Sequence, residues 1–179
     1  MGIADQLTLT RAVAVPVVVV LFAWDFSRHD YWATGVFIAA MTTDWFDGRW
    51  ARRTGSTSDF GRLLDPVADK VLVIAALVML VGRVLPAWMV VAIIAREFLI
   101  SALRLAALER GVVMSARELA KWKTTVQATA AAIAGFAAAG AWSHDVAWWA
   151  LLVALILTWV SGLDYARVAP SVLRGRQPA

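Results

Sequence analysis

The sequence predicts an all-α, polytopic membrane protein with six transmembrane helices, because of its apolar composition, the lengths of its apolar segments and the distribution of its cations. Of the 179 residues, 61% are hydrophobic and 17% are charged, which is more apolar than a typical soluble domain. Six segments approach the ~20 residues that a helix needs to cross a bilayer. They cover residues 7–25, 31–52, 63–82, 86–109, 121–142 and 146–166. We interpret residues 1–179 as a single membrane domain.

Each segment has its own justification. The first is apolar and contains Pro16. The second and third reach a spanning length only if their aspartate-rich ends lie at the membrane interface. The fourth contains the Arg96-Glu97 pair, and the fifth is rich in Ala and Gly over residues 128–141, which favours close contact between helices. The sixth is mostly apolar.

The positions of lysine and arginine indicate the orientation. If the six segments cross the membrane in turn, 15 of the 17 cations lie on the side that holds both termini, and only Arg28 and Arg83 lie on the other. Cytoplasmic segments carry such an excess, so we expect both termini in the cytoplasm. No cleavage motif follows Trp24, and we therefore read the first segment as a retained helix. The chain has no cysteine, which excludes disulfides and thiolate metal sites.

Four aspartates lie where the second segment ends and the third begins. They are Asp44, Asp47, Asp65 and Asp69. Unpaired anions near a membrane cost several kcal/mol each, roughly, and ionisable groups there are usually functional. A divalent cation would make the arrangement favourable, and hard oxygen ligands indicate Mg²⁺, Mn²⁺ or Ca²⁺.

The spacing of these residues matches a helix. One helical stripe comprises Asp44, Asp47, Gly48, Ala51 and Arg52. Its small residues leave a groove, and its arginine suits phosphate oxygens. Asp65 fits as the N-cap of the next helix with Pro66 at the first position, and Asp69 follows on the same face. The pattern indicates a metal-bridged diphosphate site; the alternative is a solvated acidic loop, which would not need helical phasing.

The pattern D-x2-D-G-x2-A-R-x8-G-x3-D-x3-D resembles the signature of the CDP-alcohol phosphotransferase family. All eight fixed positions are matched, by Asp44, Asp47, Gly48, Ala51, Arg52, Gly61, Asp65 and Asp69. Other stretches resemble the phosphatidylglycerophosphate synthase branch, namely Leu7 to Arg11 with Pro16, Asp65 to Lys70, Ala95 to Arg104, and Gly111 to Thr124. The resemblance covers most of residues 5–125, with Asp5 and Ala120 as departures from the usual Asn and Gly, and leaves the last two helices generic.

The resemblance implies transfer of a phosphatidyl group from CDP-diacylglycerol to sn-glycerol 3-phosphate, with release of CMP. It implies two ions, Mg²⁺ or Mn²⁺, one held by Asp44, Asp47 and Asp65 and the other by Asp44, Asp65 and Asp69, and it favours Asp69 as the general base. The CDP-lipid would contact Thr8, Asp47, Gly48, Ala51, Arg52 and Gly61. Family analogy implies a homodimer, and the distribution of cations predicts that the active site faces the cytoplasm from a bacterial cytoplasmic membrane.

A second polar cluster lies in the fourth and fifth segments. It comprises Arg96, Arg104, Lys121, Lys123 and Thr124. We interpret it as the site for the acceptor phosphate, because cations bind phosphate through charge-assisted hydrogen bonds. The alternative is charge neutralisation, in which Glu97 pairs with Arg96 or Arg104 and the lysines are solvated.

Three other functions are compatible with these residues. Another enzyme of the family, such as phosphatidylinositol phosphate synthase, would also need cations for a phosphorylated acceptor. A divalent-cation transporter would use the aspartates as a transit site, but the opposite half of the membrane segments is apolar apart from scattered threonines. A non-catalytic lipid-binding relative would not need the full carboxylate set. The net charge of +4 reports orientation and attraction to anionic lipids, and we do not interpret it as nucleic-acid binding.

Overall fold

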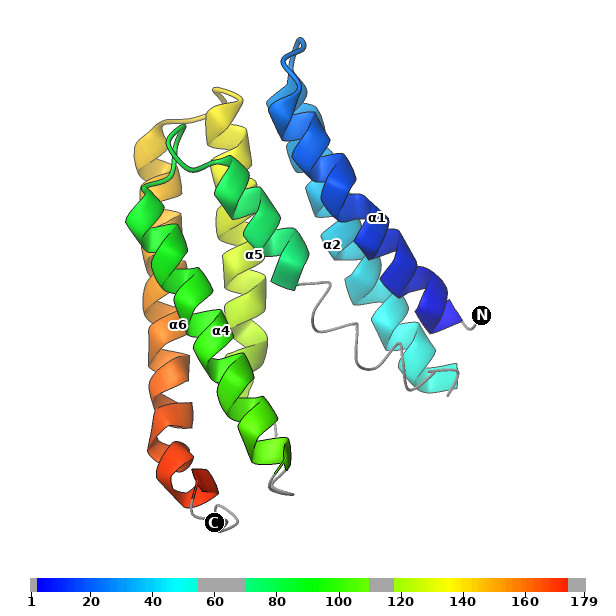
Figure 1. Cartoon of the computed structure of the whole chain (residues 1–179). Coiled ribbons are helices and arrows are strands. Elements are labelled where there is room, and N and C mark those ends of the chain that lie inside the picture. Colours follow the sequence, from blue (N-terminus) through cyan, green and yellow to red (C-terminus); the bar gives the residue numbers. More distant parts are fainter. Residues whose placement is uncertain (1–2, 55–69, 110–117, 174–179) are drawn as a thin grey trace.

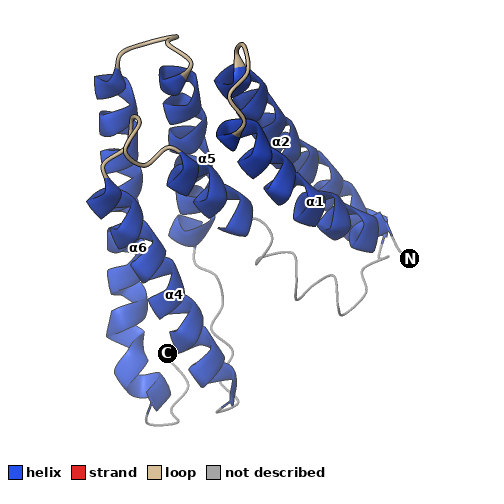
Figure 2. Ribbon diagram, turned by 45° about the horizontal axis from the view of Figure 1, so that its top comes forward, coloured by secondary structure: helices blue, strands red, loops and turns tan. Residues whose placement is uncertain are grey.

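A computed structural model describes residues 3–54, 70–109 and 118–173, and these residues form helices joined by short connections (Figure 2). The helices are α1 (Ile3–Ala23), α2 (His29–Thr54), Lys70–Met79, α4 (Ala87–Glu109), α5 (Glu118–Ala138) and α6 (His144–Leu173). Within these ranges there is no strand, only an isolated bridge between Val81 and Leu85. The predicted all-α class and the number of helices are therefore confirmed.

The helices run up and down in one bundle (Figure 1). Helices α1 and α2 pair with each other, α2 also packs on α5, and α6 packs on both α4 and α5. The three short connections at residues 24–28, 80–86 and 139–143 lie at one end of the bundle, the upper end in Figure 1. Helix α1 begins and α6 ends at the opposite end, which also holds the last turns of α2 and of α4.

Left-handed backbone conformations close the three connections. Gly82 and Gly140 have φ angles of 76° and 83°, which glycine adopts without steric cost. Gly140 follows the end of α5 and its N–H donates to the Ala137 carbonyl at 3.0 Å, a typical helix C-terminal turn. Arg28 has a φ of 63° immediately before α2 begins, a conformation that costs a residue with a side chain roughly 1–2 kcal/mol.

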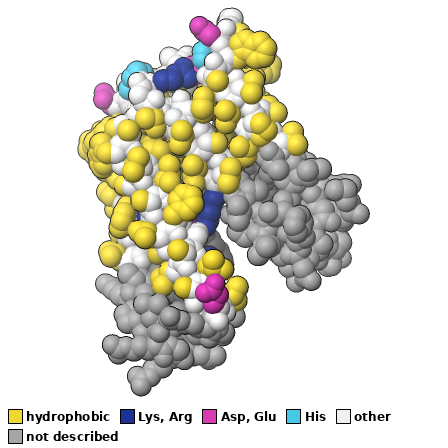
Figure 3. Space-filling view, viewed as in Figure 1, with side chains coloured by type: hydrophobic (Ala, Val, Ile, Leu, Met, Phe, Trp, Pro, Cys, Tyr) yellow, Lys and Arg dark blue, Asp and Glu magenta, His cyan; other side chains and the backbone are white. Residues whose placement is uncertain are grey.

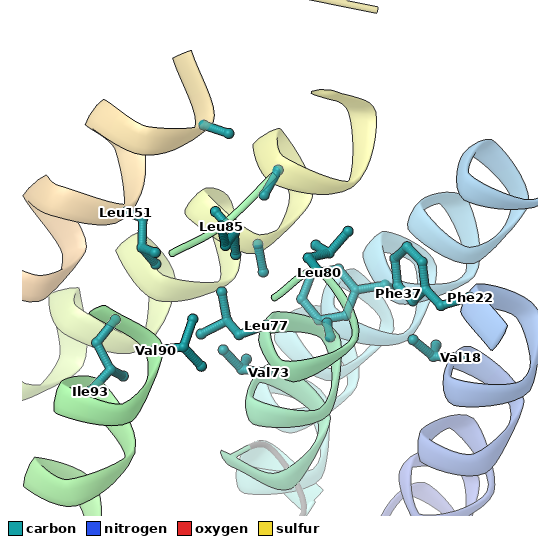
Figure 4. Close-up of a cluster of buried hydrophobic side chains, with 14 of the residues drawn as sticks. Val18, Phe22, Phe37, Val73, Leu77, Leu80, Leu85, Val90, Ile93 and Leu151 are labelled. Carbon is teal, nitrogen blue, oxygen red and sulfur yellow. The ribbon is translucent and has the colours of Figure 1, made fainter. Parts of the chain in front are cut away.

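Apolar side chains from all six described helices meet in the centre of the bundle (Figure 4). Phe37 of α2, Leu77 of the Lys70–Met79 helix, Ile93 of α4 and Leu151 of α6 are almost completely buried. Val18 of α1 is also completely buried and belongs to the same core cluster. Shape-complementary packing of this kind holds helices together whether their surroundings are water or lipid.

The small residues of α5 allow a close approach to α2. A Cβ atom at Gly135 would lie 2.1 Å from the Thr34 Oγ1 atom, so any side chain there would overlap its neighbour. Ala131 and Ala134 are also buried on this helix. The prediction that residues 128–141 serve close helix packing is confirmed.

Large apolar side chains also cover much of the outside of the bundle. Trp32, Val91, Phe98, Trp149 and Val153 are among the many that are more than half exposed. Figure 3 shows hydrophobic side chains across the middle of one face, with charged and histidine side chains gathered at its upper end. Contiguous apolar surface of this extent is rare on soluble monomers.

Length and hydropathy single out one helix. Among the described residues, only His144–Leu163 is both long and apolar enough to cross a membrane by these two criteria. Val13–Ala23 and Lys70–Met79 are shorter apolar helices. The finer prediction of six spans is taken up below with the proposed function.

An ion pair joins two elements at the upper end of the bundle. Arg83, in the connection after the Lys70–Met79 helix, donates hydrogen bonds to both carboxylate oxygens of Asp30, at 2.8 and 2.6 Å. Asp30 lies in the first turn of α2 and is 6% exposed. A planar guanidinium facing a carboxylate in this two-bonded geometry is the strongest form of ion pair between side chains.

Candidate active site

The backbone of α2 supports the helical phasing predicted for the first half of the signature. Helix α2 continues without interruption from His29 to Thr54, so Asp44, Asp47, Gly48, Ala51 and Arg52 all fall within one helix. Their side chains lie outside what the structure describes, as do those of Thr8 in α1 and Lys121 in α5. Gly61, Asp65 and Asp69 lie outside the described residues altogether. The predicted metal and CDP-lipid contacts therefore stay predictions.

The chemistry of the donor set suits a hard divalent ion. Asp44 and Asp47 are three residues apart on a continuous helix, the spacing that brings side chains onto adjacent turns. Four carboxylates without thiol or imidazole neighbours in the signature match the oxygen ligands of Mg²⁺ or Mn²⁺. Among the side chains that the structure does describe, no group of three or more acidic or histidine residues could hold a metal.

The second polar cluster is described in detail and centres on Glu97. This carboxylate is 5% exposed and comes from the middle of α4. It accepts hydrogen bonds from Arg96 at 3.0 Å and from Lys123 of α5, and Lys70 lies 3.8 Å away. Lys70 also donates to Ser101 of α4 at 2.9 Å. One carboxylate thus joins cations from three helices, which we call the Glu97 cluster.

Polar residues that the sequence interpretation did not assign complete the Glu97 cluster. Gln127 of α5 donates to Thr158 at 2.7 Å and approaches Glu97 at 3.4 Å. Ser161 of α6 accepts a hydrogen bond from Arg96 at 2.7 Å. All three are buried. The sequence offered one indication of these contacts: Thr158 and Ser161 interrupt an apolar segment, and a buried hydroxyl in such a helix needs a hydrogen-bond partner.

A glycine of α6 makes room for the arginine. A Cβ atom at Gly162 would lie 3.0 Å from Arg96 Nε and 3.5 Å from Arg96 Cγ. Arg96 is 2% exposed, so neighbouring atoms enclose its side chain on nearly every side. Helix α6, which the sequence interpretation treated as generic, therefore contributes Thr158, Ser161 and Gly162 to the cluster.

Three cations among the described residues lie around the Glu97 carboxylate, namely Arg96, Lys123 and Lys70. The charge of Arg104, half-buried one turn beyond Ser101 on α4, also acts on Lys70. Cations held close together in this way can bind an anion such as phosphate through charge-assisted hydrogen bonds.

The sequence left two roles open for these cations, namely binding of the acceptor phosphate and neutralisation of Glu97. The predicted pairing of Glu97 with Arg96 is present. The alternative that the lysines are solvated is wrong for Lys123, which is 7% exposed and bound to Glu97. Thr124 is half-buried beside Lys123 on α5. Phosphate binding by these residues stays a prediction.

Comparison with known proteins gives the family of the chain. The family model described as CDP-alcohol phosphatidyltransferase matches residues 1–160. The chain belongs to the CDP-alcohol phosphatidyltransferase family. This agrees with the resemblance carried by the eight signature residues.

Curated relatives narrow the comparison within this family. The chain is 38% identical over 179 residues to the CDP-diacylglycerol–glycerol-3-phosphate 3-phosphatidyltransferase of Bacillus subtilis (strain 168), covering 92% of this chain and 93% of that protein. It is 36% identical over 177 residues to the protein of the same name from Haemophilus influenzae, covering 93% and 92%. It is 38% identical over 171 residues to a probable phosphatidylglycerophosphate synthase of Mycobacterium tuberculosis (strain H37Rv), covering 92% and 79%.

Proposed function

We propose that this protein transfers a phosphatidyl group from CDP-diacylglycerol to sn-glycerol 3-phosphate, forming phosphatidylglycerophosphate and CMP. Family membership and the names of the similar proteins support this reaction. The structural observation that carries the choice of acceptor is the Glu97 cluster, where three cations surround one buried carboxylate. An acceptor that bears a phosphate would bind these cations through charge-assisted hydrogen bonds.

The reaction replaces one phosphate ester with another. A hydroxyl oxygen of glycerol 3-phosphate attacks the phosphorus of the phosphatidyl group, the bond from that phosphorus to CMP breaks, and the hydroxyl proton passes to Asp69. Two divalent ions held by Asp44, Asp47, Asp65 and Asp69 would neutralise the diphosphate and stabilise the departing CMP. Asp69 can serve as the base only if the chain holds it close to the attacking hydroxyl, since its ordinary pKa is about 3.9.

The signature also provides the contacts for the CDP-lipid. The small residues Gly48 and Ala51 of α2 would allow the nucleotide to approach the helix, and Gly61 would allow close approach to the backbone. Arg52 would bind the diphosphate oxygens. Thr8 and Asp47 complete the proposed CDP-lipid contacts.

The acceptor phosphate would lie against the second set of cations. Arg96, Lys123 and Arg104 would orient it, with Lys121 and Thr124 as further contacts. Arginine offers a planar pair of donors for phosphate oxygens, and lysine offers a compact charge. Separate sites for the two substrates would let the hydroxyl approach the diphosphate in line.

A multi-pass arrangement in the bacterial cytoplasmic membrane fits this reaction. An even number of helices, with α1 beginning and α6 ending at one end of the bundle, would place both termini on one side. The excess of cations makes that side cytoplasmic. The acyl tails of the donor would then remain in lipid while its headgroup meets the soluble acceptor. By analogy with the family, we propose a single domain that acts as a homodimer.

The proposal is tested with purified protein, CDP-diacylglycerol, Mg²⁺ and a panel of acceptors. Release of CMP with glycerol 3-phosphate is the expected result. Preference for inositol phosphate would instead indicate a phosphatidylinositol phosphate synthase of the same reaction class. Ion flux into vesicles without CMP release would indicate a divalent-cation transporter, and neither activity would indicate a non-catalytic lipid-binding protein.

A further inference from the structure

We propose that Ser161 and Gly162 of α6 act as positioning residues, which fix the orientation of the Arg96 guanidinium and thereby set the affinity for the acceptor phosphate. This inference rests on the proposed function, because it assumes that Arg96 belongs to the acceptor site. It gives the last helix a role in substrate selection that neither the sequence interpretation nor the signature residues assign.

Two helices hold the guanidinium at once. One terminal nitrogen of Arg96 donates to Glu97 on α4 at 3.0 Å, and the other donates to Ser161 Oγ on α6 at 2.7 Å. The Ser161 hydroxyl itself donates to the Thr158 carbonyl at 2.9 Å. With its proton committed to α6, Ser161 presents its lone pairs to the arginine as an acceptor. The guanidinium is planar, so two fixed bonds define its orientation.

Besides these hydrogen bonds, the close approach of Gly162 restricts the position of the Arg96 side chain. An added Cβ atom would lie 3.0 Å from Arg96 Nε, which is tighter than most van der Waals contacts. Arg96 is also hydrogen-bonded on two sides and 2% exposed, so it cannot swing outward without losing those bonds. A methyl group at residue 162 would therefore push the guanidinium toward the interior of the cluster.

The orientation of Arg96 affects the other cations of the acceptor site. Glu97 Oε1 accepts from both Arg96 and Lys123, so a shift of the guanidinium changes the environment of the lysine. A phosphate bound by several donors needs them in one geometry, and misplacement by about 1 Å can cost roughly a hundredfold in a positioned reaction. A disturbance at α6 should therefore weaken acceptor binding more than donor binding.

The test compares two variants of α6 with two matched controls. Ser161→Ala removes the acceptor for Arg96, and Gly162→Ala introduces the steric overlap. Thr129→Ala removes an exposed hydroxyl that bonds only within α5, to the Thr125 carbonyl, and Gly35→Ala adds a methyl group to a helix where nothing lies within 4 Å. We expect both α6 variants to raise the KM for glycerol 3-phosphate about three- to tenfold, less than the full loss of a hydrogen bond to a charged group. The KM for CDP-diacylglycerol and the values for the controls should change by less than about twofold.

A double-mutant cycle separates positioning from general stability. If Ser161 acts through Arg96, the Ser161→Ala change should add less than about twofold to the acceptor KM once Arg96→Lys has removed the planar guanidinium. Additive effects would show that α6 acts independently of Arg96 and would overturn the inference. Equal changes in both KM values, or loss of folded protein in both α6 variants, would assign α6 a structural role and overturn it too.

The wild-type protein distinguishes this inference from the proposed function. If the wild type releases no CMP with glycerol 3-phosphate, the proposed function fails. If the wild type is active and both α6 variants keep its acceptor KM, only the positioning role fails. A raised acceptor KM with an unchanged CDP-diacylglycerol KM supports both.

Discussion

Lys123 of α5 donates a hydrogen bond to Glu97 of α4, and both residues are buried in the bundle. Their helices lie on either side of residues 110–117 in the chain. Arg96, Lys70 and the α6 hydroxyls extend this contact to four helices. The pair therefore links the stability of the bundle to the charge of the proposed acceptor site, and the predictions below separate these two roles.

Glu97→Gln should destabilise the protein. The change leaves Arg96 and Lys123 buried beside a neutral amide, and breaking a buried ion pair costs about 3–5 kcal/mol. Thermal unfolding in detergent should show a clearly lower midpoint than for Glu109→Gln, which removes an exposed carboxylate at the end of the same helix. Equal midpoints for the two variants would mean that the cluster does not stabilise the fold.

The aspartates of the signature should be needed for turnover and not for folding. Asp44→Asn, Asp65→Asn and Asp69→Asn should each lower kcat by at least about a hundredfold, the scale of losing a positioned acid–base or electrostatic group. Asparagine is nearly isosteric and relieves repulsion between carboxylates, so the variants should purify like the wild type. Near-normal rates in all three would place the active site elsewhere.

The two substrate sites should respond to different variants. Lys123→Ala or Arg104→Ala should raise the KM for glycerol 3-phosphate about ten- to a hundredfold, the effect of one lost charge-assisted contact. Arg52→Ala should instead raise the KM for CDP-diacylglycerol. Steady-state kinetics with each substrate varied in turn provides the comparison. Matched effects on both substrates from every variant would contradict the assignment of separate sites.

Activity should depend on a divalent cation. Excess EDTA should abolish CMP release, and Mg²⁺ or Mn²⁺ should restore it, because the four carboxylates and the diphosphate otherwise repel one another. Calcium serves as the control, since it takes longer and more variable ligand distances than Mg²⁺. Full turnover in excess chelator would rule out the metal-assisted mechanism.

Gly135→Ala should disrupt the contact between α2 and α5. Its Cβ atom would lie 2.1 Å from Thr34 Oγ1, and overpacking a close contact typically costs about 1–3 kcal/mol. Adding Thr34→Ala should recover much of this loss by removing the overlapping atom. Gly35→Ala, with open space around it, should instead stabilise α2 slightly. An unchanged unfolding midpoint in Gly135→Ala would show that the helices can separate at no cost.

The helices could be predicted from sequence because each is an apolar segment with its own boundaries. The predicted segment 86–109 is observed as Ala87–Glu109, within one residue at the start. The segment predicted at 146–166 corresponds to a longer helix that ends at Leu173. The prediction stopped early because the charged residues after Leu163 lower the hydropathy without breaking the helix. Hydropathy reports burial in an apolar phase, and helical structure can continue beyond it.

The candidate site was only partly predictable. The sequence pairs Arg96 with Glu97, but it gives no indication that Ser161 would meet Arg96 or that Gly162 would make room for it. The Arg96–Ser161 contact joins residues 65 positions apart, and both contacts depend on how α6 packs against α4. Spacing within one helix determines which residues share a face, whereas packing between helices determines which faces meet.

The contact between Thr34 and Gly135 also has a mechanical consequence. It fixes the distance between α2 and α5 ten residues before Asp44, which corresponds to about 15 Å along the helix axis. Tilting α2 about this contact by about 4° would displace its aspartate-bearing end by roughly 1 Å, and a misplacement of that size at a positioned group can slow a reaction. The close packing at Gly135 thus helps to set the position of the aspartate-bearing end of α2 relative to α5.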